Sequence, residues 1–395
     1  MVSAKERLYK RLIFVYLVLF PFGQILRTSI SLYGRNIRLH PVDFVALIIF
    51  LLWIFEKSRR PKIYTWIKAL VVTSVFSLLF SLSLFQLEEI YVGAMYLVRV
   101  FAYISVFLIS WDVVREKAQL KSNLFMSLIA VSLATAIFGW IQYFLYPDLR
   151  SLAAYGWDDH YFRLIGTFLD PGFTSIILVF GLIATLAKYH RVKSKRLVFL
   201  SAFFLITIAF TYSRAGYLAT LGGLLTLLYL KGKIRVFLVS VVVFILSILI
   251  LPKPGGEGVN LGRTTSIFAR VANYSETLQI FKKSPVFGVG FNNLCIYRER
   301  YLGYLSTDAH SCGGADSSLL FILAVTGILG LFVFAGLAIY LVKNVSSNTF
   351  GLTLLASMSA VFIHSFFHNS LFYPWVMGYF AILSAIGLKK SKGKS

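Results

Sequence analysis

The sequence predicts an all-α integral membrane protein, a polytopic bundle of about twelve transmembrane helices with one long outer loop between the ninth and tenth spans. Of its 395 residues, 58 % are hydrophobic and 14 % are charged, whereas soluble domains are near half apolar and a quarter charged. About 18 apolar residues in a row are enough to cross a bilayer. A soluble enzyme, a disordered chain and a nucleic-acid-binding protein are therefore excluded. The apolar runs, several of them short, are residues 14–26, 42–55, 64–84, 90–110, 124–146, 173–187, 197–211, 217–230, 236–251, 319–342, 352–367 and 371–388.

Basic residues indicate how the spans are oriented. The net charge is +23, from 39 Lys and Arg against 16 Asp and Glu, and in membrane proteins Lys and Arg collect in short cytoplasmic segments. More than half of them fall in alternate connections that would share one side, so we expect both termini in the cytoplasm. No small-residue cleavage site follows the first apolar run, so we interpret it as a retained span. The basic segments are residues 5–11, 57–62, 115–121, 188–196, 231–235, 343 and 389–394.

The chain divides into three parts: residues 1–251 with spans 1–9, residues 252–318 as the long loop, and residues 319–395 with spans 10–12 and a basic tail. Within the loop, apolar residues recur with helical spacing over residues 266–281, which predicts a helix there. A loop of this length in a compact bundle is usually functional or disordered. The helical segment and the glycine turn at residues 288–290 favour a functional loop over a disordered one.

Some arginines depart from the tendency of Lys and Arg to collect on the cytoplasmic side, because they lie on the expected outer side. Arg163 and Arg214 adjoin apolar segments, where a cation is costly unless it is paired or lines a water-filled cavity. The planar guanidinium fork suits phosphate oxygens, which it binds in a bidentate manner. A bundle ion pair or a lipid headgroup contact is the alternative for each. The first outer loop adds Arg27, Arg35 and Arg38, and the long loop adds Arg263, Arg270, Arg298 and Arg300.

Four blocks at outer span ends carry a resemblance to a known family. They are residues 163–168, 211–216, 284–292 and 315–330. In order and placement they resemble the O-antigen ligase and O-antigen polymerase superfamily of bacterial envelope glycosyltransferases. The resemblance covers about the last two-thirds of the chain. The Ser-Arg-Ala-Gly block that contains Arg214 and the Pro-x-x-Gly-Val-Gly block at residues 285–290 are its most specific parts.

The resemblance implies a multi-pass protein of the bacterial inner membrane with a long periplasmic loop before span 10. It implies a donor oligosaccharide linked to undecaprenyl diphosphate, an acceptor that is another glycan or a lipid A core, and contact with membrane lipids. The transfer would invert the anomeric centre and need no cofactor, nucleotide sugar or metal. Arg163 and Arg214 match arginines of the family and would bind the diphosphate, with Arg270 as a weaker third. Gly166, Gly216, Pro285, Gly288 and Gly290 would shape the loops.

Physical chemistry supports these roles. Displacing a lipid diphosphate from the anomeric carbon develops negative charge on the leaving phosphate, and fixed cations aimed at that charge lower the barrier.

The acceptor hydroxyl needs a base or an orienting hydrogen-bond acceptor, and two residues qualify. The ligase pattern places a histidine eleven residues before the glycine of Thr-Gly, and here that position, counted back from Gly327, is Asp316. Aspartate there resembles the polymerase branch, which we slightly prefer. A short insertion could instead align His310 with the ligase histidine. Asp316 could also simply be the N-cap of the tenth span.

Three smaller features leave alternatives open. Cys295 and Cys312 both lie in the long loop, where an oxidising periplasm would permit a disulfide. His364 and His368 have the i, i+4 spacing of metal ligands, but no third ligand is evident, so bundle hydrogen bonding is favoured over a metal site. Asp158, Asp159 and His160 could reach the sugar, although we interpret them as a solvated loop.

Two rival functions predict different features. A transporter or flippase of an anionic lipid would carry charges deep inside its spans, whereas most charges here lie at span ends and Arg99 is the main exception. A non-catalytic assembly partner would tolerate replacement of Arg163 or Arg214. No phosphate-binding glycine loop supports ATP coupling.

Overall fold

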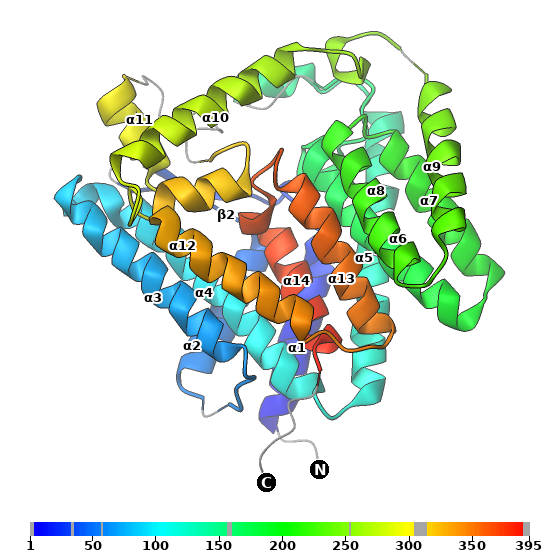
Figure 1. Ribbon diagram of the computed structural model, residues 1–395, viewed down its shortest axis with the longest axis horizontal. Coiled ribbons are helices and arrows are strands. Elements are labelled where there is room, and N and C mark those ends of the chain that lie inside the picture. The colour runs from blue at the N-terminus through cyan, green and yellow to red at the C-terminus, as the bar shows by residue number, and fades with distance from the viewer. Residues whose placement is uncertain are drawn as a thin grey trace.

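The computed structural model describes residues 4–32, 35–56, 58–155, 160–252, 254–303 and 314–389. In this part of the chain it has fourteen α-helices and one two-stranded antiparallel sheet, so the protein is a helical bundle (Figure 1). The first half contains α1 (Ala4–Leu19), β1 (Thr28–Leu32), β2 (Arg35–Leu39), α2 (Pro41–Ile54), α3 (Tyr64–Phe80), α4 (Leu87–Val114), α5 (Ala118–Leu145), α6 (Pro171–Val192) and α7 (Lys195–Ala209). The second half contains α8 (Arg214–Tyr229), α9 (Ile234–Leu249), α10 (Thr265–Lys283), α11 (Leu294–Leu302), α12 (Ser318–Lys343), α13 (Thr349–His364) and α14 (Pro374–Gly387).

Each of the twelve predicted apolar segments overlaps one helix, and α10 and α11 lie between the ninth and tenth of them. Five helical segments are long and apolar enough to cross a membrane by length and composition: Tyr64–Ser83, α4, α5, α6 and α12. Four shorter apolar helices are α2, α9, α13 and α14. The protein is therefore a helical membrane protein, while the count of twelve spans stays a prediction.

The core of the bundle is built around α6. This helix packs against α5, α7, α8 and α13, and α14 packs against α4 and α13. A continuous apolar core joins these helices, whereas α9 buries only Phe244. Among the helices named here, α6 thus forms the centre and α9 the periphery.

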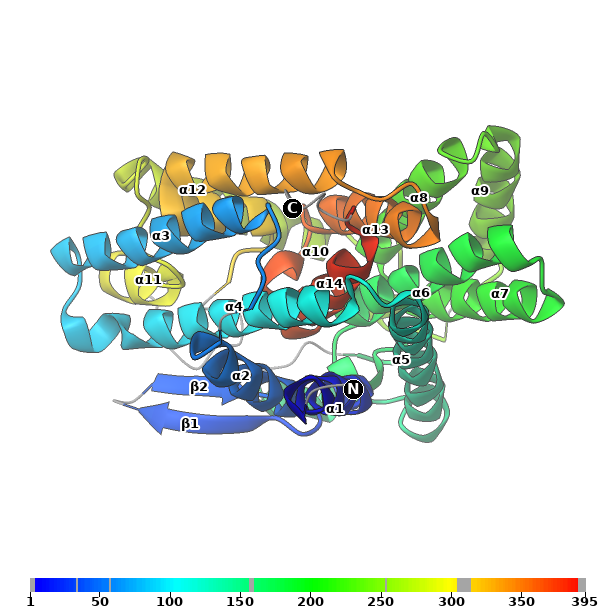
Figure 2. The same cartoon turned by 90° about the horizontal axis from the view of Figure 1, so that it is seen from below.

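Three local features differ from the sequence prediction. The first helix begins at Ala4 rather than near residue 14, and it ends at Leu19 because a turn that contains Pro21 follows. The segment predicted as the first outer loop forms a hairpin, in which Thr28 pairs with Leu39, and this hairpin lies beside α2 (Figure 2). The short helix α11 was not predicted either. The predicted loop helix at 266–281 is confirmed as α10.

The long loop lies at one end of the bundle. Figure 1 shows α10 running across the end opposite to the start of α1 and the end of α14. α10 packs on α12. The start of the first helix and the end of the last therefore share one face of the protein, and the loop helix covers the other.

The Pro-x-x-Gly-Val-Gly block attaches the loop to a kink in α12. The backbone at Gly327 is non-helical, with φ of 66°, so α12 cannot make its regular hydrogen bonds there. The loop replaces them: Val289 N–H donates to Ala324 O (2.9 Å), Gly290 N–H donates to Val325 O (3.2 Å), and Ile328 N–H donates to Pro285 O (2.9 Å). Buried backbone groups are thereby satisfied.

Glycine is required on both sides of this contact. A Cβ atom at Gly327 would lie 2.1 Å from Val286 O, and one at Gly288 would lie 2.3 Å from the carbonyl carbon of Val325. The two backbones approach too closely for a side chain. Both glycines also have positive φ angles, which only glycine adopts freely.

Candidate functional site

A cavity of about 1290 Å³ opens beneath α10, larger than the 300–1,000 Å³ of an ordinary ligand pocket. It collects residues from β2, α4, the segment before α6, the start of α8, α10, the segment before α12 and the turn after α13. Its lining is cationic, because arginines outnumber carboxylates. The arginines are Arg38, Arg99, Arg150, Arg163, Arg214, Arg263 and Arg270, and the carboxylates are Asp170, Glu257, Glu276 and Asp316.

Arg163 is almost fully buried, with 7 % of its surface exposed. Its Nε donates to Thr211 O and its Nη2 donates to Tyr212 O, both at 3.2 Å. These carbonyls belong to the turn that leads into α8, so Arg163 and Arg214 lie on the same wall of the cavity. The two arginines that the sequence singled out are thus brought together.

The Ser-Arg-Ala-Gly block forms the first turn of α8. The Ser213 side chain caps the helix by accepting a hydrogen bond from Gly216 N–H (3.1 Å). A Cβ atom at Gly216 would lie 2.3 Å from Ser175 Oγ, so this glycine lets α8 pack closely against α6. Arg214 is therefore held at a helix N-terminus, where the helix dipole also favours anions.

Arg214 is fixed by neutral groups of the long loop. Its Nη1 donates to Arg263 O (3.0 Å) and to Leu261 O (3.4 Å), and its Nη2 donates to Ser266 Oγ (2.7 Å). These contacts orient the guanidinium group without neutralising its charge.

Arg263 and Arg270 complete a cationic wall. Arg263 Nη1 donates to Gly258 O (2.8 Å) and to Asn260 O (2.9 Å). Arg270, on α10, lies 6.0 Å from the centre of the Phe367 ring. We call Arg214, Arg263 and Arg270 the α8–α10 arginine cluster. Among the described residues, none of the three forms a salt bridge with a carboxylate.

The members of this cluster repel one another. Burial, followed by the charges of Arg214 and Arg270, lowers the pKa of Arg263. The group still remains charged at neutral pH, because an arginine pKa starts above 12. An anion bound between the three guanidinium groups would relieve this repulsion.

Asp316 lies two residues before the start of α12 and lines the cavity. Its backbone N–H donates to Asn273 Oδ1 on α10 (2.9 Å). The N-cap of α12 is Ser317, whose side chain accepts from Leu320 N–H. The alternative in which Asp316 is the N-cap is therefore wrong, and Asp316 lines the same cavity as the arginines.

Several predicted residues cannot be placed. His310, Cys312, Asp158 and Asp159 lie outside the described residues. Cys295 is disulfide-bonded. The interpretation of His160 as part of a solvated loop is wrong, because this residue is 3 % exposed and lines the cavity.

His364, the last residue of α13, and His368, in the turn after it, lie in two different environments. The two rings are stacked, with centroids 4.7 Å apart. His364 Nδ1 lies 2.6 Å from Ser370 Oγ, in agreement with hydrogen bonding in the bundle. His368 instead lines the cavity. Burial, followed by the charges of Arg270 and Arg163, lowers the pKa of His368 to about 3, so its ring is neutral at physiological pH.

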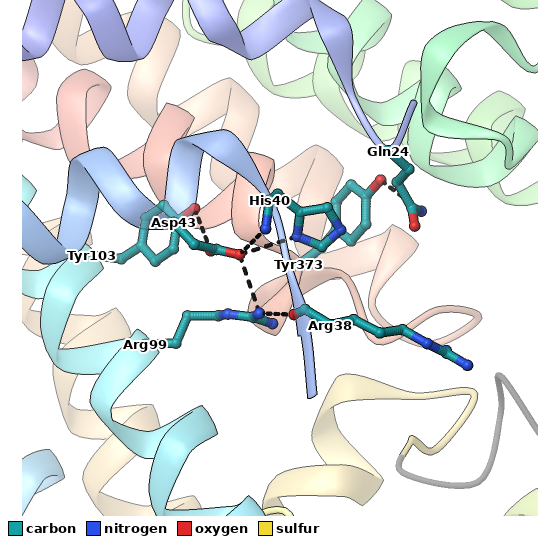
Figure 3. Close-up of polar contacts among 7 residues, drawn as sticks. All are labelled: Gln24, Arg38, His40, Asp43, Arg99, Tyr103 and Tyr373. Carbon is teal, nitrogen blue, oxygen red and sulfur yellow. Dashed lines mark hydrogen bonds and ion pairs between the residues drawn. The ribbon is translucent and has the colours of Figure 1, made fainter. Parts of the chain in front are cut away.

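A buried ion pair closes another part of the cavity wall (Figure 3). Asp43 Oδ2 lies 3.1 Å from Arg99 Nη2 and 3.0 Å from His40 Nδ1. Tyr103 O–H donates to Asp43 Oδ1 (3.0 Å). The charge of Arg99, deep in α4, is thus balanced by a carboxylate on α2. Sequence reasoning missed this partner, which lies 56 positions earlier in the chain.

The loop-shaping residues fall at the expected turns. Gly166 begins the turn Gly166–Phe168, and Ile165 N–H and Gly166 N–H donate to Gln142 Oε1. Pro285, Gly288 and Gly290 form the contact with the kink of α12 described above. The glycine and proline blocks therefore connect loops to spans around the cavity.

The fold and this cavity define a class of protein, a helical membrane protein with an arginine-lined chamber at one end of its bundle. A family model described as O-antigen ligase matches residues 197–335. The match confirms the resemblance to the O-antigen ligase and polymerase superfamily and indicates a glycosyltransferase of the O-antigen ligase type. It includes Arg214, Arg270 and Asp316, while Arg163 lies before it. No curated protein matches the chain.

Proposed function

We propose that the protein transfers a glycan from an undecaprenyl-diphosphate carrier to an acceptor hydroxyl in this cavity, at the periplasmic face of the bacterial inner membrane. Arg163 and the α8–α10 arginine cluster bind the diphosphate. The observation that carries the proposal is the cluster itself: three guanidinium groups on one wall, held by neutral partners and without a carboxylate partner among the described residues. Such a wall favours a doubly charged leaving group over a neutral ligand.

The chemistry is a single inverting displacement. The acceptor oxygen attacks the anomeric carbon, and the bond from that carbon to the diphosphate oxygen breaks. The electron pair stays on the diphosphate, where the arginines stabilise it. The hydroxyl proton passes to Asp316, or to His310, the other candidate from the sequence.

Polymerisation of surface-polysaccharide repeats is our leading version of this reaction, because an aspartate stands where the ligase pattern has histidine. Ligation of the glycan to a lipid A core is the second candidate, and the description of the matching family favours it. A flippase is less well supported, because Arg99, the main charge that the sequence places inside a span, is balanced by Asp43.

The test is to supply the purified protein in nanodiscs with lipid-linked oligosaccharide and to measure product size. A ladder of added repeats indicates a polymerase, whereas one mass shift on a lipid A core indicates a ligase. The absence of transfer with either acceptor would contradict the proposal.

The same assay identifies the base. We expect Asp316→Ala to lower the rate about 10²- to 10⁴-fold, because its contact with Asn273 is made by the backbone and survives the substitution. Glu89→Gln is the matched control, since the carboxylate of Glu89 pairs with Arg300 (2.9 Å) and does not line the cavity. If Asp316→Ala remains active and His310→Ala does not, the base is His310. Activity in both variants would contradict both assignments.

A further inference from the structure

Part of the cavity lining differs in chemistry from the arginines. Asp170, Phe173 and His368 all line the cavity, and they offer a carboxylate, an aromatic ring and an imidazole in place of guanidinium groups. Asp170 is the N-cap of α6, Phe173 lies in the first turn of that helix, and His368 follows the end of α13. We call these three residues the α6 subsite.

The three side chains lie together at the first turn of α6. A Cβ atom at Gly172 would lie 2.5 Å from His368 Cε1 and 3.0 Å from Asp170 Oδ1. The rings of Phe173 and His368 have centroids 5.7 Å apart. The glycine therefore leaves room for the imidazole beside the carboxylate.

Phe173 is the outer ring of an aromatic stack. It lies parallel to Tyr373, with centroids 3.7 Å apart and an interplanar angle of 8°, and Tyr373 contacts Trp375. The Tyr373 hydroxyl accepts a hydrogen bond from Gln24 Nε2 (3.3 Å; Figure 3). Phe173 is half-buried, whereas Tyr373 is 8 % exposed and Trp375 is fully buried. The inner rings thus hold Phe173 in place as an accessible apolar surface of the cavity.

The polar groups beside this ring are accessible to a ligand. Asp170 Oδ1 accepts the capping hydrogen bond from Phe173 N–H (2.7 Å). In the described part of the chain Asp170 forms no salt bridge, and its second oxygen is not among the buried atoms without a partner. The same holds for the ring nitrogens of His368. Since this imidazole is neutral, it offers one donor and one acceptor.

A carboxylate, a neutral imidazole and an aromatic face suit an uncharged sugar. The hydroxyls at the edge of a sugar ring donate to a carboxylate and exchange hydrogen bonds with an imidazole. The C–H groups on the face of the sugar pack on an aromatic ring, whose face is electron-rich. A phosphate or an acidic sugar would be repelled by Asp170. The α6 subsite therefore favours a different ligand from the arginine cluster.

The subsite adjoins the arginines assigned to the diphosphate. The charges of Arg270 and Arg163 both lower the pKa of His368, so both guanidinium groups lie near its ring. Arg270 also lies 6.0 Å from the ring of Phe367, the residue before His368. In a lipid-linked oligosaccharide the first sugar is joined directly to the diphosphate. A donor held by the arginines therefore has its first sugar within reach of the α6 subsite.

We propose that the α6 subsite binds the first sugar of the donor and selects an uncharged sugar at that position. Asp170 and His368 bind its hydroxyls, and Phe173 packs against its ring. The inference rests on the proposed function, because it names the group that follows the bound diphosphate. An acceptor glycan has the same chemistry, so the experiment has to distinguish the two.

The experiment measures dissociation constants in nanodiscs, without acceptor, for undecaprenyl diphosphate and for undecaprenyl diphosphate that carries glucose. Asp170→Ser keeps an N-cap for α6 but removes the carboxylate. We expect it to weaken binding of the glucose-bearing carrier about 10- to 100-fold, the effect of losing hydrogen bonds to a charged group. The bare carrier should bind as before or more tightly, because a negative charge near the diphosphate is lost. Arg214→Gln should weaken binding of both carriers.

Phe173→Leu tests the subsite without changing the cap. It removes the aromatic face, so the glucose-bearing carrier alone should lose affinity, by about 2- to 10-fold. Phe380→Leu is the matched control, because Phe380 is also half-buried and contacts a second ring, that of Phe180. Asn348→Ser is the control for the cap, since Asn348 caps α13. Neither Phe380 nor Asn348 lines the cavity, so binding should not change.

A third probe tests the preference for an uncharged sugar. Undecaprenyl diphosphate that carries glucuronic acid differs from the glucose probe by one carboxylate. The wild-type protein should bind the acidic probe about 10-fold more weakly, because Asp170 repels it, and Asp170→Ser should reduce this difference. Equal or tighter binding of the acidic probe by the wild-type protein would contradict the selectivity.

The thermal unfolding temperature verifies that each variant is folded. Folded Asp170→Ser and Phe173→Leu proteins that bind both carriers as the wild-type protein does would overturn this inference and leave the proposed function intact. A rise in the KM of the acceptor with unchanged donor binding would assign the subsite to the acceptor, which also overturns it. Failure of the wild-type protein to bind undecaprenyl diphosphate would instead overturn the proposed function.

Discussion

The two groups of arginine in the cavity are held in opposite ways. Arg99 is paired with a buried carboxylate, Asp43, which also bonds His40 and Tyr103. Arg214 and Arg263 are held by carbonyl and hydroxyl oxygens, and Arg270 has no carboxylate partner in the described part of the chain.

This difference indicates what each group does. A buried charge that the protein itself neutralises supports the structure, because removing its partner leaves an uncompensated charge. A charge that is oriented by neutral oxygens is still available to a ligand. Replacing a charge of the first kind, such as Asp43 or Arg99, should lower the stability of the protein. Replacing a charge of the second kind, such as Arg270, should lower its activity.

The largest effect on stability should come from Asp43→Asn. This substitution leaves Arg99 buried without its counter-charge and weakens the hydrogen bonds to His40 and Tyr103. We expect a loss of about 3–5 kcal/mol, measured as a fall in the unfolding temperature of the protein in detergent. Tyr103→Phe is the control, because it removes one hydrogen bond and should cost about 1 kcal/mol. Similar values for the two variants would contradict a structural role for the ion pair.

Arg270→Gln should show the reverse pattern. The rate of glycan transfer should fall about 10²- to 10³-fold, as when one group that stabilises transition-state charge is removed. The unfolding temperature should not fall, because the substitution relieves repulsion with Arg263. Arg300→Gln provides the control for both measurements. A large loss of stability with unchanged transfer would assign Arg270 to the structure instead.

A smaller effect concerns pH. The pKa of His368 is about 3 in the folded protein against 6.5 as its ordinary value. Below pH 6.5 the unfolded chain therefore binds a proton that the folded protein does not. The stability that this residue contributes is complete above pH 6.5 and decreases as the pH falls toward 3, by about 2 kcal/mol at pH 5.

His368→Gln should remove this part of the pH dependence. The measurement is the difference in unfolding temperature between pH 7 and pH 5, which should be smaller in the variant than in the wild-type protein. An equal difference in both proteins would show that His368 is not held neutral in the folded protein.

The sequence predicted the parts of the fold that depend on local pattern. Apolar runs predicted the helices, and the period of Ile267, Val271 and Leu278 predicted α10, because both signals lie within one element. The hairpin formed by β1 and β2 has five residues in each strand. A pattern of five residues is a much weaker signal in the sequence than the long apolar runs of the predicted membrane spans, so the hairpin was not predicted.

The site was predictable only in part. The sequence singled out Arg163 and Arg214 because cations beside apolar segments are unusual. In the structure, both arginines line the same wall of the cavity. Contacts between distant segments were not predictable: Asp43 with Arg99, and Arg163 with the turn before α8. His160 was misinterpreted because its neighbours are polar, although tertiary packing buries it.

The docking of the loop on the kink of α12 limits how substrates reach the cavity. Three backbone hydrogen bonds join the two segments, and lifting the loop would expose these groups at a cost of about 1–3 kcal/mol each. A substrate that enters the cavity without displacing the loop keeps these bonds intact.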